Sequence, residues 1–484
     1  MLDLPFRSAK QLAAAIKSRK IGCKELLDLY LKRVEKYNPR LNAIIASDIP
    51  AAQKRARAAD AAAKKRAKLG PLHGVPMTIK ESFNVVGMPT TWGVPDLKNN
   101  YPARNALAVD RFLAAGAVLF GKTNVPIYLA DWQSYNAIYG TTNNPWDLSL
   151  SPGGSSGGSA AALAAGLTGI DAGSDIGSSI RNPAHYCGIY GHKPSWGICS
   201  PRGHAMPGVV AQSDISAIGP LARSAEDIAL ALSVMAGPDE IDGAGWKLSL
   251  PAPRRKALRE FKVAVMLTDP NSEVDRAVQD RIQAVADFLA KKKAKVSDRA
   301  RPAFDTTDAQ RTFILMLRAA TSGRLSPEQF QKNQEQLKTL RPDDESYFAR
   351  MTRGNVMPHR DWIKLNNARH QMRLQWAEFF KDWDLLICPP AASAACPHDH
   401  EGDRWQRSIA VNGKRVPATD HLFWAGYSGL FYLPSTIAPA GFTTKGLPVG
   451  VQIVGSQYAD RTTIEFARLL EREFQAFVPP KGYD

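Results

Sequence analysis

The sequence predicts an α/β fold: a single large domain whose mixed, mostly parallel central β-sheet is covered by helices on both faces. Two patterns lead to this prediction. Short apolar runs of the length of buried strands alternate with amphipathic helical segments, and no stretch of the chain repeats another. The strand candidates are residues 75–79, 118–120, 263–267, 385–388 and 450–454, and the helix candidates are residues 105–115, 274–290 and 461–474.

Two amphipathic helices open the chain. Ser8 can cap the first helix, which should end near Gly22. The second should end at Asn38-Pro39, because the residue before a proline avoids helical backbone angles. Its apolar face consists of Leu26, Tyr30, Val34 and Tyr37.

We expect one domain over residues 1–484 with four segments. They are N-terminal helices over about 1–70, a catalytic core over about 71–235, a variable segment over about 236–380, and a C-terminal part of the same sheet over about 381–484.

The composition is that of a globular protein, with 44% hydrophobic and 22% charged residues among 484, which excludes disordered, collagenous and fibrous chains. Five scattered cysteines without a CxxC pair favour a reducing compartment over a disulfide framework. No run of 18 apolar residues occurs, and the N-terminus lacks the basic-then-apolar order of a secretory signal. We therefore expect a cytoplasmic protein with no membrane partner.

A net charge of +16 raises the question of a nucleic-acid partner. Lysine and arginine gather at residues 54–57, 64–68 and 291–295. The first two clusters lie in an Ala-rich helical stretch, which is typical of a solvated helix face. No zinc-finger spacing, aromatic RNP pattern or basic region with heptads accompanies them, so we do not expect nucleic acid to bind.

The segment that carries chemistry has two clusters of glycine and serine, residues 151–159 and 173–181, on either side of an Ala-rich helical run at 160–165. Glycine-rich loops can turn several backbone N–H groups toward one point, and such a point beside a hydroxyl is what acyl transfer requires. A flexible loop would explain one cluster, but two clusters around a packable helix favour a catalytic site. The residues alone do not choose among Ser174, Ser178 and Ser179, nor among the lysines.

An alternative starts from residues 153–157, which match the G-x-S-x-G nucleophile elbow of α/β-hydrolases. It would make Ser155 the nucleophile of an esterase, with a later Asp and His. The elbow requires a strand directly before it, and Pro145 and Pro152 disfavour one because proline removes a ladder donor.

Residues 153–195 resemble the signature of the amidase signature family of serine amidohydrolases, and the resemblance extends over most of the chain. It implies the amidase signature fold and hydrolysis of linear amides through an acyl-enzyme. The other blocks that resemble the family are residues 74–81, 121–124, 144–147, 214 with 219–224, 439–442 and 446–452.

The resemblance implies a Ser-cisSer-Lys triad. Ser179 matches the nucleophile, Ser155 the bridging serine that follows a cis peptide, and Lys80 the base. Lysine must be largely neutral to act as a base near pH 7, so Lys80 should be buried, and Glu81 should face the other side of the strand. The oxyanion would be held by the backbone N–H groups of Ile176, Gly177, Ser178 and Ser179.

The remaining site residues are expected to support this arrangement. Ser156, Asp175 and Arg181 should brace the loop, and Ser178 stands where the family usually has glycine, so a positive φ would strain it. The candidates for the substrate pocket are Asp131, Trp132 and Gln133.

We expect no cofactor and no metal. Residues 398–401, His-Asp-His-Glu, resemble a metal cluster but lie in a polar loop without third-ligand spacing. The expected partner is a small amide substrate, and assembly into a homodimer stays an open alternative.

The leading interpretation is an amidase that cleaves carboxamides, with side activity on anilides, esters or carbamates. The same fold could instead be the glutaminase subunit of a tRNA-dependent amidotransferase, which would make sense of the basic surface. A nucleic-acid-binding protein with a degenerate catalytic core is disfavoured, because all three triad positions are occupied.

Overall fold

A computed structural model describes residues 3–65, 68–253 and 255–484. Its strands are β1 (Ile44–Ser47), β2 (Pro76–Lys80), β3 (Val118–Thr123), β4 (Tyr135–Asn136), β5 (Gly140–Thr141), β6 (Asp171–Asp175), β7 (Tyr190–Lys193), β8 (Ala217–Ala222), β9 (Lys262–Val265), β10 (Lys295–Ser297), β11 (Leu385–Cys388), β12 (Ser408–Val411), β13 (Lys414–Pro417), β14 (Ser435–Phe442) and β15 (Pro448–Val454).

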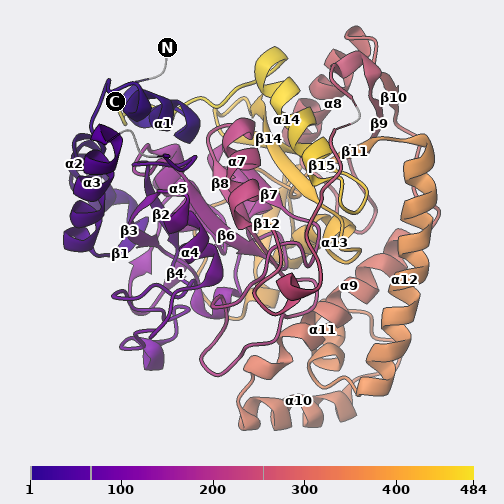
Figure 1. Ribbon diagram of the computed structural model, residues 1–484. Helices are drawn as coiled ribbons and strands as arrows, with labels where there is room; N and C mark the ends of the chain where they lie inside the picture. Colours follow the sequence, from indigo (N-terminus) through magenta and orange to yellow (C-terminus); the bar gives the residue numbers. More distant parts are fainter. Residues whose placement is uncertain (1–2, 66–67, 254) are drawn as a thin grey trace.

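The α-helices lie around these strands (Figure 1). They are α1 (Ala9–Lys17), α2 (Cys23–Leu41), α3 (Ile49–Lys64), α4 (Leu107–Ala114), α5 (Gly157–Ala164), α6 (Arg181–Cys187), α7 (Ala225–Met235), α8 (Arg276–Lys291), α9 (Thr306–Thr321), α10 (Pro327–Thr339), α11 (Tyr347–Asn355), α12 (His359–Asp382), α13 (Leu422–Gly429) and α14 (Asp460–Glu473).

The central sheet has eight strands in the order β10-β9-β11-β15-β14-β7-β8-β6. A smaller sheet, β1-β3-β2, lies beside it, and a parallel bridge between Met77 and Ile170 joins the two. This bridge brings β2 next to the start of β6. The strand that ends in Lys80 and the strand that leads to Ser179 are thus neighbours.

The prediction of a mixed α/β sheet is confirmed, but the expectation that it is mostly parallel is wrong. Among the described strands, five of the seven pairings in the large sheet are antiparallel, and β9 forms the two parallel ones, with β10 and β11. The strands β14 and β15 form a hairpin through a tight turn at residues 443–447. Antiparallel neighbours need no helical crossover, so alternation of strands and helices along the chain overstated the number of parallel pairs.

The predicted N-terminal helices are present with two differences. Helix α1 ends at Lys17, before the predicted end near Gly22, because Arg19 adopts a left-handed φ of 59°, and Gly22 instead caps the start of α2. Ser8 caps α1 in a capping box with Gln11, as expected.

Helix α2 continues past Pro39 to Leu41, because the proline stands in the last turn and the backbone N–H of Asn42 still bonds to Asn38 at 2.6 Å. A proline at this point removes one donor without ending the helix.

Helix α5, which follows Ser155 and Ser156, is completely buried. A Cβ atom at Gly158 would lie 2.3 Å from the backbone nitrogen of Asn124, so only glycine allows this approach. The Gly/Ser/Ala composition of the motif therefore lets α5 pack deep among β2, β3 and β6 and fixes the two serines at its start.

A hydrophobic core extends from Phe6 to Tyr483 and includes buried residues from each predicted segment. The four-segment division of the chain remains a prediction.

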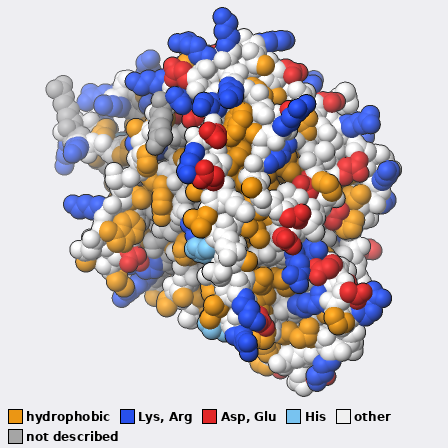
Figure 2. Space-filling view, turned by 90° about the vertical axis from the view of Figure 1, so that its right-hand side faces the viewer, with side chains coloured by type: hydrophobic (Ala, Val, Ile, Leu, Met, Phe, Trp, Pro, Cys, Tyr) orange, Lys and Arg blue, Asp and Glu red, His pale blue; other side chains and the backbone are white. Residues whose placement is uncertain are grey.

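The basic clusters lie on the surface. In α3, Lys54 and Arg57 are exposed while Ala52 and Ala56 face the core, and Arg66 of the predicted cluster lies outside the described residues. On the face shown in Figure 2, acidic side chains lie between many of the lysines and arginines. None of the helices in residues 3–65, 68–253 and 255–484 has the length and apolar character that a membrane span needs.

Candidate active site

Lys80 stands at the end of β2 with its side chain fully buried. Its Nζ lies 2.7 Å from Ser155 Oγ and 3.0 Å from Ser174 Oγ, with the Ser174 carbonyl at 3.4 Å. The adjacent Glu81 points elsewhere and accepts the backbone N–H groups of Thr91 and Trp92. The amine of Lys80 therefore faces hydroxyl groups, as the triad hypothesis requires.

Burial lowers the pKa of Lys80 from 10.5 to about 7, because the charged ammonium loses its hydration. The negative charges of Asp175 and Asp171 oppose this change, and the positive charge of Arg324 adds to it. A substantial fraction of Lys80 is therefore a neutral amine near pH 7, and a neutral amine can accept a proton.

The bridging serine lies in a loop that crosses other backbone closely. The Gly154–Ser155 peptide is cis, as the resemblance implies. A Cβ atom at Gly154 would lie 2.5 Å from the Asp131 carbonyl oxygen, so glycine is required there as well. The backbone N–H of Ser156 donates to the carbonyl of Ser179 at 3.1 Å, which joins the two glycine–serine segments.

Ser179 follows β6 in the short loop that precedes α6, and 5% of the surface of this residue is exposed. Among the described residues, no hydrogen bond links its hydroxyl to that of Ser155. The two serines are held near each other through the bond from the Ser156 N–H, and the relay between their side chains remains a prediction.

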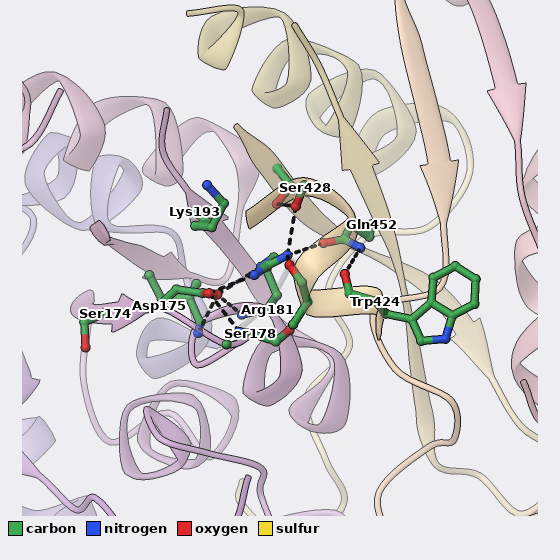
Figure 3. A network of polar contacts seen from close by, with 12 residues as sticks. Ser174, Asp175, Ser178, Arg181, Lys193, Trp424, Ser428 and Gln452 are labelled. Carbon is green, nitrogen blue, oxygen red and sulfur yellow. Dashed lines mark hydrogen bonds and ion pairs between the residues drawn. The ribbon is translucent and has the colours of Figure 1, made fainter. Parts of the chain in front are cut away.

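The carboxylate of Asp175 organises the nucleophile loop (Figure 3). It accepts the backbone N–H groups of Ser178 at 2.9 Å, Ile180 at 3.1 Å and Arg181 at 3.3 Å. The Arg181 guanidinium adds two bonds, from Nε at 3.0 Å and from Nη2 at 2.8 Å. Burial alone would raise the pKa of Asp175, but Arg181 and these bonds lower it to about 2, so the carboxylate stays charged.

Arg181 also ties this loop to the C-terminal part of the chain (Figure 3). Its Nη1 donates to Ser428 Oγ at 2.9 Å, to Gln452 Oε1 at 2.8 Å and to the carbonyl of Ala425 at 3.0 Å. Gln452 in turn donates to the carbonyl of Trp424 at 3.1 Å. These contacts are those of a brace, which is the role expected for Asp175 and Arg181, and no sequence motif pointed to Ser428 or Gln452.

The structure differs from the prediction at Ser178. This residue has a φ of 75°, so it does occupy the strained region expected of it, but its backbone N–H already donates to Asp175 Oδ1 at 2.9 Å, which leaves this N–H without the free donor capacity that the prediction requires. Within the described part of the chain, the N–H groups of Ile176, Gly177 and Ser179 have no hydrogen-bond acceptor. The carbonyl of Gly177 accepts the indole N–H of Trp132 at 2.6 Å, which fixes the orientation of that peptide.

The three pocket candidates line one cavity of about 1010 Å³. Trp132 connects the cavity to the nucleophile loop through Gly177. Asp131 pairs with Arg407 at 2.8 Å, and the Gln133 side chain forms two hydrogen bonds with the backbone of Asp399. Trp132 thus lies between the cavity and the nucleophile loop, while Asp131 and Gln133 form part of the cavity wall, and contact of these residues with a substrate remains a prediction.

His421, which the sequence did not single out, also lines this cavity, and its ring centre lies 4.7 Å from that of Trp132. Burial lowers the pKa of His421 to about 3, so the ring is uncharged at neutral pH.

The two alternative site hypotheses gain no support from the geometry. Residues 151–154 form no strand, so the elbow geometry is missing, and the side-chain partner of Ser155 is Lys80. Across residues 3–65, 68–253 and 255–484 no group of His, Cys, Asp and Glu side chains is arranged to hold a metal ion. The ring of His400 instead stacks on Tyr135 with ring centres 3.7 Å apart.

Comparison with known proteins agrees with the fold and the motifs. The Amidase family model matches residues 25–464. The chain is 31% identical to an indoleacetamide hydrolase of Bradyrhizobium diazoefficiens over 472 residues, covering 96% of this chain and 86% of that protein. It is also 31% identical to a glutamyl-tRNA(Gln) amidotransferase subunit of Bdellovibrio bacteriovorus over 495 residues, covering 97% of each.

Among solved structures, a bacterial aryl acylamidase of the amidase signature family shares the fold, with a TM-score of 0.82 over 97% of this chain and 96% of that one at 24% identity. The match to the family model defines the class of protein: an amidase-family hydrolase that acts on carbon–nitrogen bonds. The chain belongs to the amidase signature family.

Proposed function

We propose that the protein is a serine amidohydrolase that cleaves carboxamides through an acyl-enzyme on Ser179. The observation that carries the proposal is the buried Lys80 amine, 2.7 Å from Ser155 Oγ, in a site where the Ser156 N–H also bonds to Ser179. A base that can be neutral, a bridging hydroxyl and a second serine on a braced loop are the parts that nucleophilic acyl transfer needs.

In this mechanism Ser179 Oγ attacks the carbonyl carbon while its proton passes to Ser155, whose own proton passes to Lys80 Nζ. The tetrahedral oxyanion is held by the free backbone N–H groups of Ile176, Gly177 and Ser179. The C–N bond then breaks as Lys80 returns the proton through Ser155 to the leaving nitrogen. Water, deprotonated along the same path, hydrolyses the Ser179 ester and regenerates the free hydroxyl.

The experiment that tests this proposal is a panel of amides, anilides, esters and carbamates, assayed with the purified wild type and with Ser179→Ala. We expect turnover of carboxamides by the wild type and loss of every activity in the variant. A variant that keeps its amidase activity would show that Ser179 is not the nucleophile.

A second candidate, the glutaminase subunit of a tRNA-dependent amidotransferase, is favoured by two observations. They are the 31% identity to a protein of that kind and the net charge of +16. The same assay separates the two functions. Turnover of simple amides by the single chain supports a stand-alone amidase, and turnover of glutamine that requires tRNA and added partner proteins supports the second candidate.

A further inference from the structure

The peptide between Gly177 and Ser178 is held at both of its polar ends. Its carbonyl accepts the indole N–H of Trp132 at 2.6 Å, and its N–H donates to Asp175 Oδ1 at 2.9 Å. The peptides on either side of it carry the N–H groups of Gly177 and Ser179, for which the described residues provide no hydrogen-bond acceptor. The orientation of this central peptide therefore helps to set the direction of the two free N–H groups.

The backbone at Ser178 favours a different orientation of this peptide. Its φ of 75° lies in the left-handed region, which a residue with a Cβ atom adopts only at a cost in free energy. Rotation of the Gly177–Ser178 peptide by about half a turn would change ψ of Gly177 and bring φ of Ser178 to a negative value. Gly177 does not oppose this rotation, because glycine tolerates many backbone angles. The hydrogen bonds with Trp132 and Asp175 hold the peptide against it.

The indole of Trp132 reaches this peptide from a segment 45 residues away along the chain. The residues on both sides of Trp132 are anchored in the cavity wall. Asp131 pairs with Arg407 at 2.8 Å. The side chain of Gln133 forms two hydrogen bonds with the backbone of Asp399. The indole N–H is therefore a donor with a fixed position, against which the nucleophile loop is held.

The imidazole of His421 supports the indole from another part of the chain. The two ring centres lie 4.7 Å apart, with an angle of 30° between the ring planes. The imidazole is fixed in turn, because the backbone N–H of Ala392 donates to His421 Nδ1 at 3.0 Å. Trp132 and His421 both line the cavity, so the indole links the cavity wall to the nucleophile loop.

We propose that Trp132 is a positioning residue for catalysis. Its indole N–H holds the Gly177–Ser178 peptide so that the N–H groups of Gly177 and Ser179 face the carbonyl oxygen of the substrate. Negative charge develops on that oxygen in the transition state, and donors already in position then stabilise the transition state more than the bound substrate. Loss of the indole N–H should therefore act mainly on kcat. This inference rests on the proposed amidase function.

The first test is Trp132→Phe, which keeps an aromatic ring in the cavity wall and removes the N–H. For the best carboxamide of the panel, kcat should fall at least about tenfold while KM stays within about threefold of the wild type. Trp146→Phe is the matched control, because the indole N–H of Trp146 also donates to a backbone carbonyl, that of Cys187 at 3.0 Å at the end of α6. The control should lower kcat by less than about twofold.

The second test introduces Ser178→Gly, which separates positioning of the loop from a general structural role. With glycine at this position the positive φ is no longer strained, so the peptide depends less on the indole. Trp132→Phe should then lower kcat by less than about threefold in the Ser178→Gly background, against at least about tenfold in the wild-type background. Equal losses in the two backgrounds would overturn the proposal, because a substrate contact or a loosened cavity wall does not depend on Ser178.

Labelling by a fluorophosphonate gives a readout that does not require amide turnover. Ser179 Oγ displaces fluoride from phosphorus, its proton passes to the base, and the phosphoryl oxygen takes the place of the oxyanion. The second-order rate constant should fall at least about tenfold in Trp132→Phe and should recover when Ser178→Gly is added. An unchanged labelling rate in Trp132→Phe would show that the indole does not act on the loop.

The failure of this inference and that of the proposed function are distinguishable. An unchanged kcat in Trp132→Phe, or a loss confined to KM, overturns the role of Trp132 and leaves the amidase intact. If the wild type hydrolyses no amide, the proposed function itself fails, and the labelling rates decide whether Trp132 positions the loop.

Discussion

Lys80 and Lys193 make an instructive pair, since both are completely buried and burial lowers the pKa of each from 10.5 to about 7. The amine of Lys80 meets Ser155 and Ser174, whereas that of Lys193 donates to the carbonyl of Pro194 at 3.0 Å, behind the Asp175–Arg181 pair. A carbonyl cannot pass on a proton, but a hydroxyl can. Desolvation therefore makes both lysines potential bases. Only Lys80 lies next to hydroxyl groups from which it can accept a proton.

The largest expected effect separates the two lysines. Lys80→Ala should lower kcat/KM for a carboxamide by about 10⁴-fold, because it removes the general base. Lys193→Met should cost less than about tenfold, because no proton path leads from this amine. The assay uses purified variants whose circular dichroism matches the wild type, and comparable losses in both would show that burial rather than position matters.

The buried ion pair between Asp175 and Arg181 should make a large contribution to the free energy of unfolding. Arg181→Met leaves the charge of Asp175 buried without its partner, which should lower the free energy of unfolding by about 3–5 kcal/mol. Lys338→Met is the control, because its pair with Glu335 is exposed and should contribute less than about 1 kcal/mol. Urea unfolding measures both, and similar small losses would mean that the loop does not depend on this pair.

The pH dependence of kcat/KM tests whether Lys80 is the general base. Because the amine must be unprotonated to act, kcat/KM should rise with pH and level off above about 7. Asp171, bonded to the Thr78 hydroxyl at 2.6 Å, raises the pKa of Lys80 through its charge. Burial raises the pKa of Asp171 itself to about 7, so Asp171 is only partly charged near neutral pH and its effect on Lys80 should be small. Asp171→Asn should therefore move the midpoint of the profile to lower pH, and a midpoint that rises would contradict the assignment of Lys80 as the titrating base.

The smallest effect concerns the strained residue of the loop. Ser178 combines a φ of 75° with a buried hydroxyl that has no partner among the described residues. Ser178→Gly should raise the free energy of unfolding by about 1 kcal/mol, because glycine adopts this conformation freely. Ser178→Ala keeps the strain and should gain less, so equal gains in the two variants would assign the effect to the hydroxyl alone.

The sequence could predict those parts of the site that depend on residues close together along the chain. The glycine–serine segments and the strand before Lys80 are local patterns, and their placement agreed with the structure. The opposite orientation of Glu81 followed from strand alternation alone. Choosing Lys80 and Ser179 required the family resemblance, because no local pattern marks one lysine or one serine among many.

Features that depend on distant segments were not predictable. Gln452 and Ser428 contact Arg181 from other strands and helices, and His421 reaches Trp132 across the cavity. The direction of the Ser178 N–H depends on where the Asp175 carboxylate turns after β6. The mostly antiparallel sheet likewise reflects which strands meet in space, and strand–helix alternation does not record that.

The most direct test of the central claim, that the uncharged amine of Lys80 activates Ser179 through Ser155, is the rate of labelling by a serine-directed fluorophosphonate as a function of pH. The reaction should modify Ser179, as located by peptide mass spectrometry, with a rate that rises with pH around a midpoint of about 7 and that falls steeply in Lys80→Ala and Ser155→Ala. Labelling of another serine, or an unchanged rate at Ser179 in Lys80→Ala, would contradict the mechanism.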